Sequence, residues 1–168
     1  MTRDVRILNT GSLLELQRRL RAAGGENIRS SMQRRIRRAA EPLKDDLQST
    51  TRGMNIRSQG RSGRGGGPSP NTRPLRATIA DAIRISVRTS GNPGATVWLD
   101  KGRMPPDMKN IPAQLNAGRL RHPVFGNRRR WASQYASPPW WDQTVRRHQP
   151  RMTAEVARVL DDVRRRLE

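Results

Sequence analysis

Hydrophobic side chains recur at helical spacing toward the C-terminal end of the chain. The apolar positions are Met152, Val156, Val159, Leu160, Val163 and Leu167. Because this spacing brings all of them to one side of an α-helix, it predicts a C-terminal helix that begins at about Trp141. Pro150 lacks a backbone donor, so we expect it to kink this helix or to begin its second half.

Two further helices are predicted in the N-terminal part of the chain. Ser12 and Glu15 have the spacing of a capping box, and they predict a first helix over about residues 12–23. A longer helix is predicted over 26–51, because its apolar residues again share one side. These residues are Ile28, Met32, Ile36, Leu43 and Leu47, with Ala39 and Ala40 between them. Pro42 is expected to kink or break this helix.

Alternating apolar and polar residues predict strands on both sides of the turn-forming sequence at 90–94. The apolar positions are Ile83, Ile85 and Val87 before the turn and Ala95, Val97 and Leu99 after it. We therefore expect an antiparallel hairpin over about 83–99. A further strand near 121–125 is expected to join the same sheet.

Shorter elements are predicted around this hairpin. Val5 and Ile7 alternate with other residues, which is typical of a short strand. Residues 75–82 have the length of one or two helical turns. A short helix is predicted over 107–117, and Gly118 is a natural residue to end it.

The order of these elements predicts an α+β fold. We expect a small antiparallel sheet that packs with the long N-terminal helix and the C-terminal helix. A chain of 168 residues is within the usual size of one domain, so a single domain over 1–168 is expected. Residues 53–74 are rich in Gly and Arg and poor in apolar side chains. Such a segment cannot bury enough surface to offset its chain entropy, which predicts a flexible loop.

The charge balance is strongly positive. The chain has 34 Lys and Arg residues against 14 Asp and Glu, a formal net charge of +20 at pH 7, and nearly all of the cations are arginines. Self-repulsion of this size favours acidic partners, and the forked guanidinium suits both phosphate and carboxylate. Because only 33% of residues are hydrophobic, the core of the monomer should be modest, and oligomerisation would add buried surface.

Residue types that carry catalysis are scarce. The chain has no Cys and two histidines, of which His122 is interpreted as structural and His148 as exposed. The sequence from Gly63 to Gly67 lacks the Lys and Ser/Thr of a phosphate-binding loop, and no spacing typical of a metal site occurs. We therefore expect no catalytic residue, no metal and no cofactor. A nuclease or toxin that assembles two carboxylates from distant positions stays open.

No membrane partner is expected. The chain has no apolar run that approaches the about 18 residues of a candidate membrane span. Its first residues lack the apolar stretch of a signal peptide.

Arginine and tryptophan supply the candidate interface residues. These are Arg57, Arg61, Arg64, Arg128, Arg129, Arg130, Trp140 and Trp141. Trp131 is expected to lie in the core. Of the two adjacent tryptophans, at most one can easily point inward, which leaves the other as an interface anchor, because Trp is favoured in interface hot spots.

Residues 118–127 read Gly-Arg-Leu-Arg-His-Pro-Val-Phe-Gly-Asn, and Trp131, Gln134 and Pro139-Trp140-Trp141 follow them. Together with Met104-Pro105-Pro106 after the hairpin, this pattern resembles the neck proteins of long-tailed double-stranded DNA phages, the head–tail joining or tail-completion family. The resemblance covers roughly residues 75–168. It implies structural roles, in a turn and strand that hold the terminal helix on the sheet, for His122, Pro123, Phe125, Gly126 and Trp131.

The resemblance also implies a function. It points to a non-enzymatic virion protein that forms a ring of six or twelve copies at the head–tail junction after assembly in the host cytoplasm. Such a ring joins the filled head to the tail and lets double-stranded DNA pass. The implied partners are further copies of the chain, the stopper or adaptor, the tail terminator and the tail tube. The alternative is a free basic nucleic-acid-binding protein, whose affinity for DNA would fall steeply as salt rises.

Overall fold

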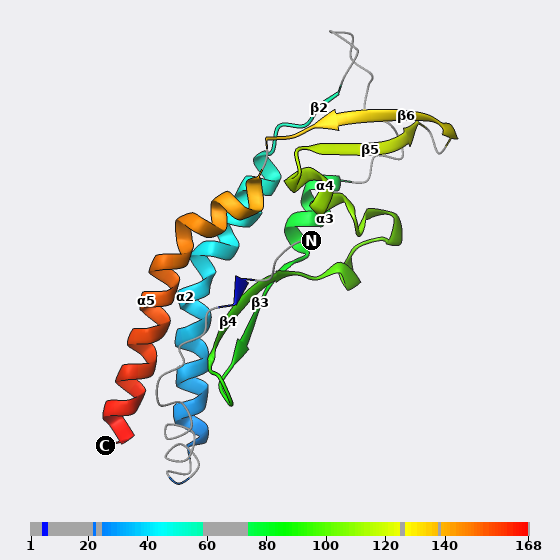
Figure 1. The fold of residues 1–168 in the computed structure, drawn as a ribbon. Helices are drawn as coiled ribbons and strands as arrows, with labels where there is room; N and C mark the ends of the chain where they lie inside the picture. The colour runs from blue at the N-terminus through cyan, green and yellow to red at the C-terminus, as the bar shows by residue number, and fades with distance from the viewer. Residues whose placement is uncertain are drawn as a thin grey trace. The chain divides into compact units, whose positions relative to one another are not determined.

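A computed structural model describes residues 5–6, 22, 25–58, 74–124, 127–137 and 139–167 (Figure 1). These residues belong to two compact units, each built from separate parts of the chain. The first unit takes its described residues from 47–83 and 99–144, and the second from 3–46, 84–98 and 145–168. The predicted helix over 12–23 lies outside the described residues except for Ala22, and so do Arg61, Arg64, Phe125 and Gly126.

Two long helices supply most of the buried side chains of the second unit. Helix α2 is Glu26–Gly53 and contributes its residues as far as Asp46, and helix α5 is Trp140–Leu167 and contributes those from Val145 onward. The predicted apolar sides are confirmed. The buried residues are Met32, Ile36, Ala40 and Leu43 in α2 and Val145, Met152, Val156, Val159, Leu160 and Val163 in α5.

Both helices are continuous through their internal prolines, so the break that was one of the two outcomes predicted at Pro42 does not occur. Pro42 and Pro150 are exposed. At an exposed position, water can satisfy the carbonyl that loses its amide partner, and the ring does not disturb the packed side of the helix.

Polar contacts join α2 to α5 within the second unit. Arg35 Nη2 donates to Asp162 Oδ2 at 2.5 Å. His148 Nε2 lies 2.7 Å from Asp46 Oδ2, and the His148 side chain is only 21% exposed. The expectation of an exposed His148 was therefore wrong, because this side chain turns toward a carboxylate that is distant in the sequence.

The contact between Arg35 and Asp162 predicts a pH dependence of stability. The hydrogen bond from Arg35 lowers the pKa of Asp162 below its ordinary value, and the charges of Arg35, Arg165 and Arg166 act in the same direction, while burial opposes them. A carboxyl whose pKa is lowered by folding stabilises the fold above its unfolded pKa of about 3.9, and this contribution is lost as the pH falls through the folded value.

Asp162→Asn is therefore expected to lower the melting temperature at neutral pH and to match the unchanged protein once Asp162 is protonated at low pH. Thermal unfolding across the pH range measures this. The matched control is Asp161→Asn, which removes the same charge from an exposed carboxylate that lies 3.8 Å from Arg164. An equal loss in both variants at neutral pH would mean that net charge, and not the Arg35 contact, is responsible.

The predicted hairpin is confirmed in the second unit. It consists of β3, Ile83–Arg88, and β4, Gly94–Leu99, and the glycine in its turn, Gly91, has a φ of 70°. The short strand β1, Val5–Arg6, pairs antiparallel with β4, which gives the order β1-β4-β3.

A second antiparallel sheet, in the first unit, has the order β2-β6-β5 (Figure 1). Its strands are β2, Arg57–Ser58, β5, Arg119–Val124, and β6, Asn127–Tyr135. The strand predicted near 121–125 is thus present, but its assignment to the hairpin sheet was wrong. The reason is that β5 pairs with β6 at each of its residues from Arg119 to Val124. No strand was predicted at β6, so this pairing could not be expected.

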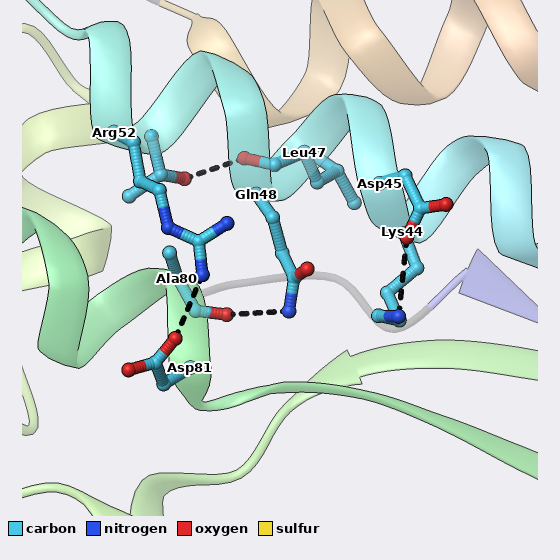
Figure 2. Close-up of polar contacts among 8 residues, drawn as sticks. Lys44, Asp45, Leu47, Gln48, Arg52, Ala80 and Asp81 are labelled. Carbon is cyan, nitrogen blue, oxygen red and sulfur yellow. Dashed lines mark hydrogen bonds and ion pairs between the residues drawn. The ribbon is translucent and has the colours of Figure 1, made fainter.

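Short helices complete the first unit. They are α3, Leu75–Asp81, η1, Lys101–Arg103, η2, Pro106–Met108, and α4, Ile111–Asn116. Figure 2 shows how the end of α2 is tied to α3 within this unit, where Arg52 Nη2 lies 2.8 Å from Asp81 Oδ1 and Gln48 Nε2 donates to Ala80 O at 3.0 Å. The helix predicted over 107–117 is divided in two, and Pro112 lies in the first turn of α4, where a missing amide donor is harmless.

Gly118 ends α4 as predicted, in a backbone conformation that disfavours other residues. Its φ is 87°, its amide donates to Leu115 O at 2.9 Å, and its carbonyl accepts from Ala136 N at 3.1 Å. Gly118→Ala is expected to lower the free energy of unfolding by about 1–2 kcal/mol, because a side chain at positive φ crowds the following carbonyl.

Chemical denaturation would measure this change. Gly53→Ala is the matched control, because Gly53 is the last residue of α2 and an added Cβ there meets nothing within 4 Å. This control should be neutral or slightly stabilising. Equal destabilisation by the two variants would contradict the role given to Gly118.

Candidate functional site

One side of the sheet β2-β6-β5 carries both of the exposed large hydrophobic side chains of the described residues. Arg57 and Arg119 are both paired with Tyr135, and Pro123 is paired with Trp131. Residues directly opposite each other on neighbouring strands point to the same side, and every second residue along a strand does so too. We call the exposed members of this side the Arg/aromatic face. They are Arg57, Arg119, Arg121, Trp131 and Tyr135.

The aromatic residues of this face are exposed although the sheet around them is ordered by hydrogen bonds. Trp131 is 48% exposed and Tyr135 is 40% exposed. The guanidinium carbon of Arg121 lies 4.9 Å from the centre of the Trp131 ring, a cation–π geometry. Trp131 Nε1 donates to Arg128 O at 2.8 Å. The Trp131 ring is therefore held in place at the surface.

The other side of the same sheet faces the interior of the first unit. Leu120 is 3% exposed, and Ala132 and Gln134, which point the same way, are half-buried. Helix α4 contacts β5, and Gln114 Oε1 accepts the backbone amide of Arg121 at 3.0 Å. The sheet therefore has one packed side and one solvent side, and the Arg/aromatic face is the solvent side.

Three arginines adjoin this face where the pairing of β5 with β6 becomes irregular. Pro123 pairs with Trp131, but the next residue, Val124, pairs with Asn127. The three residues between these partners on β6 are therefore extruded from the regular ladder, as in an extended bulge. They are Arg128, Arg129 and Arg130, and all three are exposed.

The charge of this sheet has one sign. Its strands contain six arginines and no Asp or Glu. The arginines are Arg57, Arg119, Arg121, Arg128, Arg129 and Arg130. Arg119 donates to the neutral Ser133 Oγ, at 3.1 Å from Nη2 and 3.3 Å from Nε. The guanidinium groups of such a surface can donate hydrogen bonds to carboxylates, and its rings can pack against apolar atoms of a partner.

Both tryptophans that were expected to include an interface anchor are buried. Trp140 is 4% exposed and Trp141 is 1% exposed, and their rings meet edge to face with centroids 5.5 Å apart. Trp131, which was expected in the core, is the exposed one. The expectation failed because neighbouring residues on a helix point only about 100° apart, so an embedded first turn can bury both.

Helix α5 begins against α4 through a small polar network within the first unit. Asn116 Oδ1 accepts the backbone amide of Trp141 at 3.0 Å, and Asn116 Nδ2 donates to Asp142 Oδ2 at 3.0 Å. The side chain of Asn116 therefore satisfies an amide of the first helical turn from outside the helix. With the two buried rings, this contact fixes where α5 starts.

Of the interface residues predicted from the sequence, the structure brings Arg57 and Arg128–Arg130 to this sheet. Sequence interpretation missed Arg119, Arg121 and Tyr135. The alternation of Arg119, Leu120 and Arg121 in the motif was the signal that could have found the first two, because it predicts a half-buried strand with arginines on its exposed side.

His122 and the acidic side chains are of the types that act as metal ligands or reactive groups. His122 is half-buried in β5, with Nδ1 3.2 Å from Pro123 O. Over the ranges that the structure describes, no group of three or more His, Asp or Glu side chains has the arrangement of a metal site. Within the same ranges, no helix combines the length and hydrophobicity needed to cross a membrane.

Comparison of the chain with models of known protein families, with curated proteins and with solved structures finds no match.

Proposed function

We propose that this chain is a structural subunit of the phage neck, which forms a ring that joins the DNA-filled head to the tail and lets DNA pass. The observation that carries the proposal is the Arg/aromatic face, on which the exposed rings of Trp131 and Tyr135 lie among arginines on a sheet without a carboxylate. Trp, Tyr and Arg are the residues most enriched at the energetic centres of protein interfaces.

The composition of this face favours a protein partner. Proteins that bind single-stranded nucleic acid combine a basic groove with open aromatic faces on which the bases stack. Here Arg121 already covers one side of the Trp131 ring, and the indole N–H is already bonded to Arg128 O. A protein surface that carries carboxylates needs only the guanidinium groups and the exposed edge of the ring.

The motif residues support an architectural role for the chain. His122 and Pro123 lie within β5, and the backbone amide of Trp141 joins the first turn of α5 to Asn116 of α4. These residues build the sheet and anchor a helix, and they do not converge on a substrate.

A ring explains how the positive charge is accommodated. In a cyclic assembly, one surface of each subunit contacts a different surface of its neighbour, and closure leaves no such surface unpaired. An acidic surface on a neighbouring subunit or on the next ring would neutralise the Arg/aromatic face. The proposed partners are further copies of this chain, the stopper or adaptor, the tail terminator and the tail tube.

Deleting the coding sequence from the phage or prophage that carries it tests the proposal. We expect normal filled heads and normal tails that remain separate in electron micrographs, and rescue of joined particles by a plasmid copy. Particles that join normally without the protein would overturn the proposal.

A second measurement separates the proposal from the alternative. Light scattering of the purified protein, at low and high salt and with and without duplex DNA, gives its mass. We expect ring-sized oligomers, or a monomer that ignores DNA at physiological salt and assembles with phage tails. A monomer that binds DNA tightly, with affinity that falls steeply as salt rises, would favour a free nucleic-acid-binding protein.

A further inference from the structure

A groove with a volume of about 380 Å³ lies between α2 and α5 in the second unit. Its apolar lining residues, which we call the floor, are Ala39, Pro42, Leu43, Met152 and Val159. Its other lining residues, which we call the walls, are polar and come from both helices. These are Arg35, Arg38, His148, Arg151 and Glu155.

Three of the five polar side chains on the walls already have partners. Arg35 bonds to Asp162, His148 contacts Asp46, and Glu155 Oε1 accepts from Arg158 at 3.0 Å. Arg38 and Arg151 are exposed, and within the part of the chain that the structure describes neither forms an ion pair. Two uncommitted guanidinium groups, one from each helix, therefore line an apolar floor.

We infer that this groove binds a short acidic segment of a partner protein, with an apolar side chain on the floor and carboxylates on Arg38 and Arg151. The groove and such a peptide have complementary chemistry. Of the apolar lining residues, Ala39 is half-buried and Pro42 is exposed, so these two offer apolar atoms for contact. Guanidinium groups bind carboxylates in a forked geometry. A segment laid along a groove between helices is a common mode of peptide recognition.

The apolar floor favours a peptide over nucleic acid. A phosphate backbone would use the arginines but would leave the floor unused, because nucleic acids bind basic surfaces mainly through phosphate charge. Glu155, on the wall next to Met152, would also repel a continuous line of phosphates. A peptide can put an apolar side chain on the floor and keep its carboxylates away from Glu155.

This groove is separate from the Arg/aromatic face. Its residues belong to the second unit, whereas the face belongs to the first. The inference therefore does not rest on the proposed neck function. A segment of any acidic partner protein would meet the same chemistry.

Fluorescence anisotropy at physiological salt tests the inference with three labelled probes and the full chain. The first probe is a short peptide of glutamates with leucines at helical spacing, the second has serine in place of each leucine, and the third is a single-stranded oligonucleotide of equal charge. The groove variant is Arg38→Glu with Arg151→Glu. The matched control is Arg37→Glu with Arg146→Glu, two exposed arginines on the same helices that do not line the groove.

We expect the leucine peptide to bind the unchanged protein at least about tenfold more tightly than the groove variant, because both charged contacts are reversed. The control variant should bind it within about twofold of the unchanged protein, since exposed charges outside a contact contribute little. The serine peptide should bind more weakly than the leucine peptide.

Three outcomes would overturn the inference. One is equal loss of peptide binding in the groove and control variants, which would show that only net charge matters. Another is equal binding of the leucine and serine peptides, which would show that apolar contacts on the floor contribute nothing to the affinity. The third is an oligonucleotide that binds more tightly than the leucine peptide and loses more affinity in the groove variant, which would assign the groove to nucleic acid.

Discussion

Trp141→Ala is expected to lower the free energy of unfolding by about 3–5 kcal/mol, the usual loss when a large aromatic side chain is removed from a core. Trp141 is 1% exposed, and its ring meets that of Trp140 edge to face. The hydrogen bond that the backbone amide of residue 141 donates to Asn116 Oδ1 can persist in the variant. The expected loss therefore comes from the cavity and the missing ring contact, and urea denaturation would measure it.

Two further variants make this result interpretable. Trp141→Phe keeps a ring in the cavity and should lose clearly less than the alanine variant, which matters if the latter does not fold. Trp131→Ala removes the same side chain from the surface and should lose about 0.5–1 kcal/mol, the usual strength of an exposed cation–π contact. A larger loss at Trp131 than at Trp141 would contradict the exposure of Trp131 and the burial of Trp141.

The second large effect is expected on assembly, and it rests on the proposed neck function. The double variant Trp131→Ala with Tyr135→Ala should remain folded, because both side chains are at least 40% exposed. If each side chain contributes the about 2 kcal/mol of an interface hot spot, binding of the neighbouring subunit or ring should weaken by roughly 700-fold. Complementation of the phage deletion by the variant gene, counted as infectious particles, measures the consequence.

The matched variant is Trp131→Phe with Tyr135→Phe, which keeps an aromatic ring at both positions. It should restore most of the yield, because ring area contributes more to an interface than the indole N–H or the phenol hydroxyl. Circular dichroism of both variants confirms that each is folded. Full complementation by the alanine variant would exclude the Arg/aromatic face as a joining surface and would leave open whether the chain acts in the neck.

Much of the fold could be predicted because the apolar residues of its longer elements keep a regular period. The stripe from Met152 to Val163 and the alternation around the turn at 90–94 each predict one element, and both elements are present. Such patterns are reliable since each reflects a single packed side. They are also local, so they need no knowledge of which elements meet.

The second sheet could not be predicted in the same way. Strand β6 begins with Asn127 and three arginines, and its irregular pairing interrupts the alternation that identifies a strand. Its other neighbour, β2, comes from a Gly- and Arg-rich segment that is far away in the sequence and has no apolar alternation. Pairing of this kind depends on the tertiary structure, which a local pattern does not contain.

The candidate face could be predicted only in part, because its assembly also depends on which strands pair. Arg57 and Arg128–Arg130 were found by their residue type, whereas the neighbourhood of Arg121 and Trp131 depends on the register of two strands. The contact of His148 with Asp46 joins residues 102 positions apart in the sequence, so a local sequence pattern could not predict it either.

The unequal burial of three of its four tryptophans lets their fluorescence report two different events. Indole emission moves to shorter wavelengths when water is excluded from the ring and to longer wavelengths when water gains access. Trp140 and Trp141 are covered in the folded chain, so unfolding shifts their emission toward the red. Trp131 is 48% exposed, so a partner that covers it shifts its emission toward the blue. Unfolding and the binding of a partner to the Arg/aromatic face thus shift tryptophan emission in the same unlabelled sample in opposite directions.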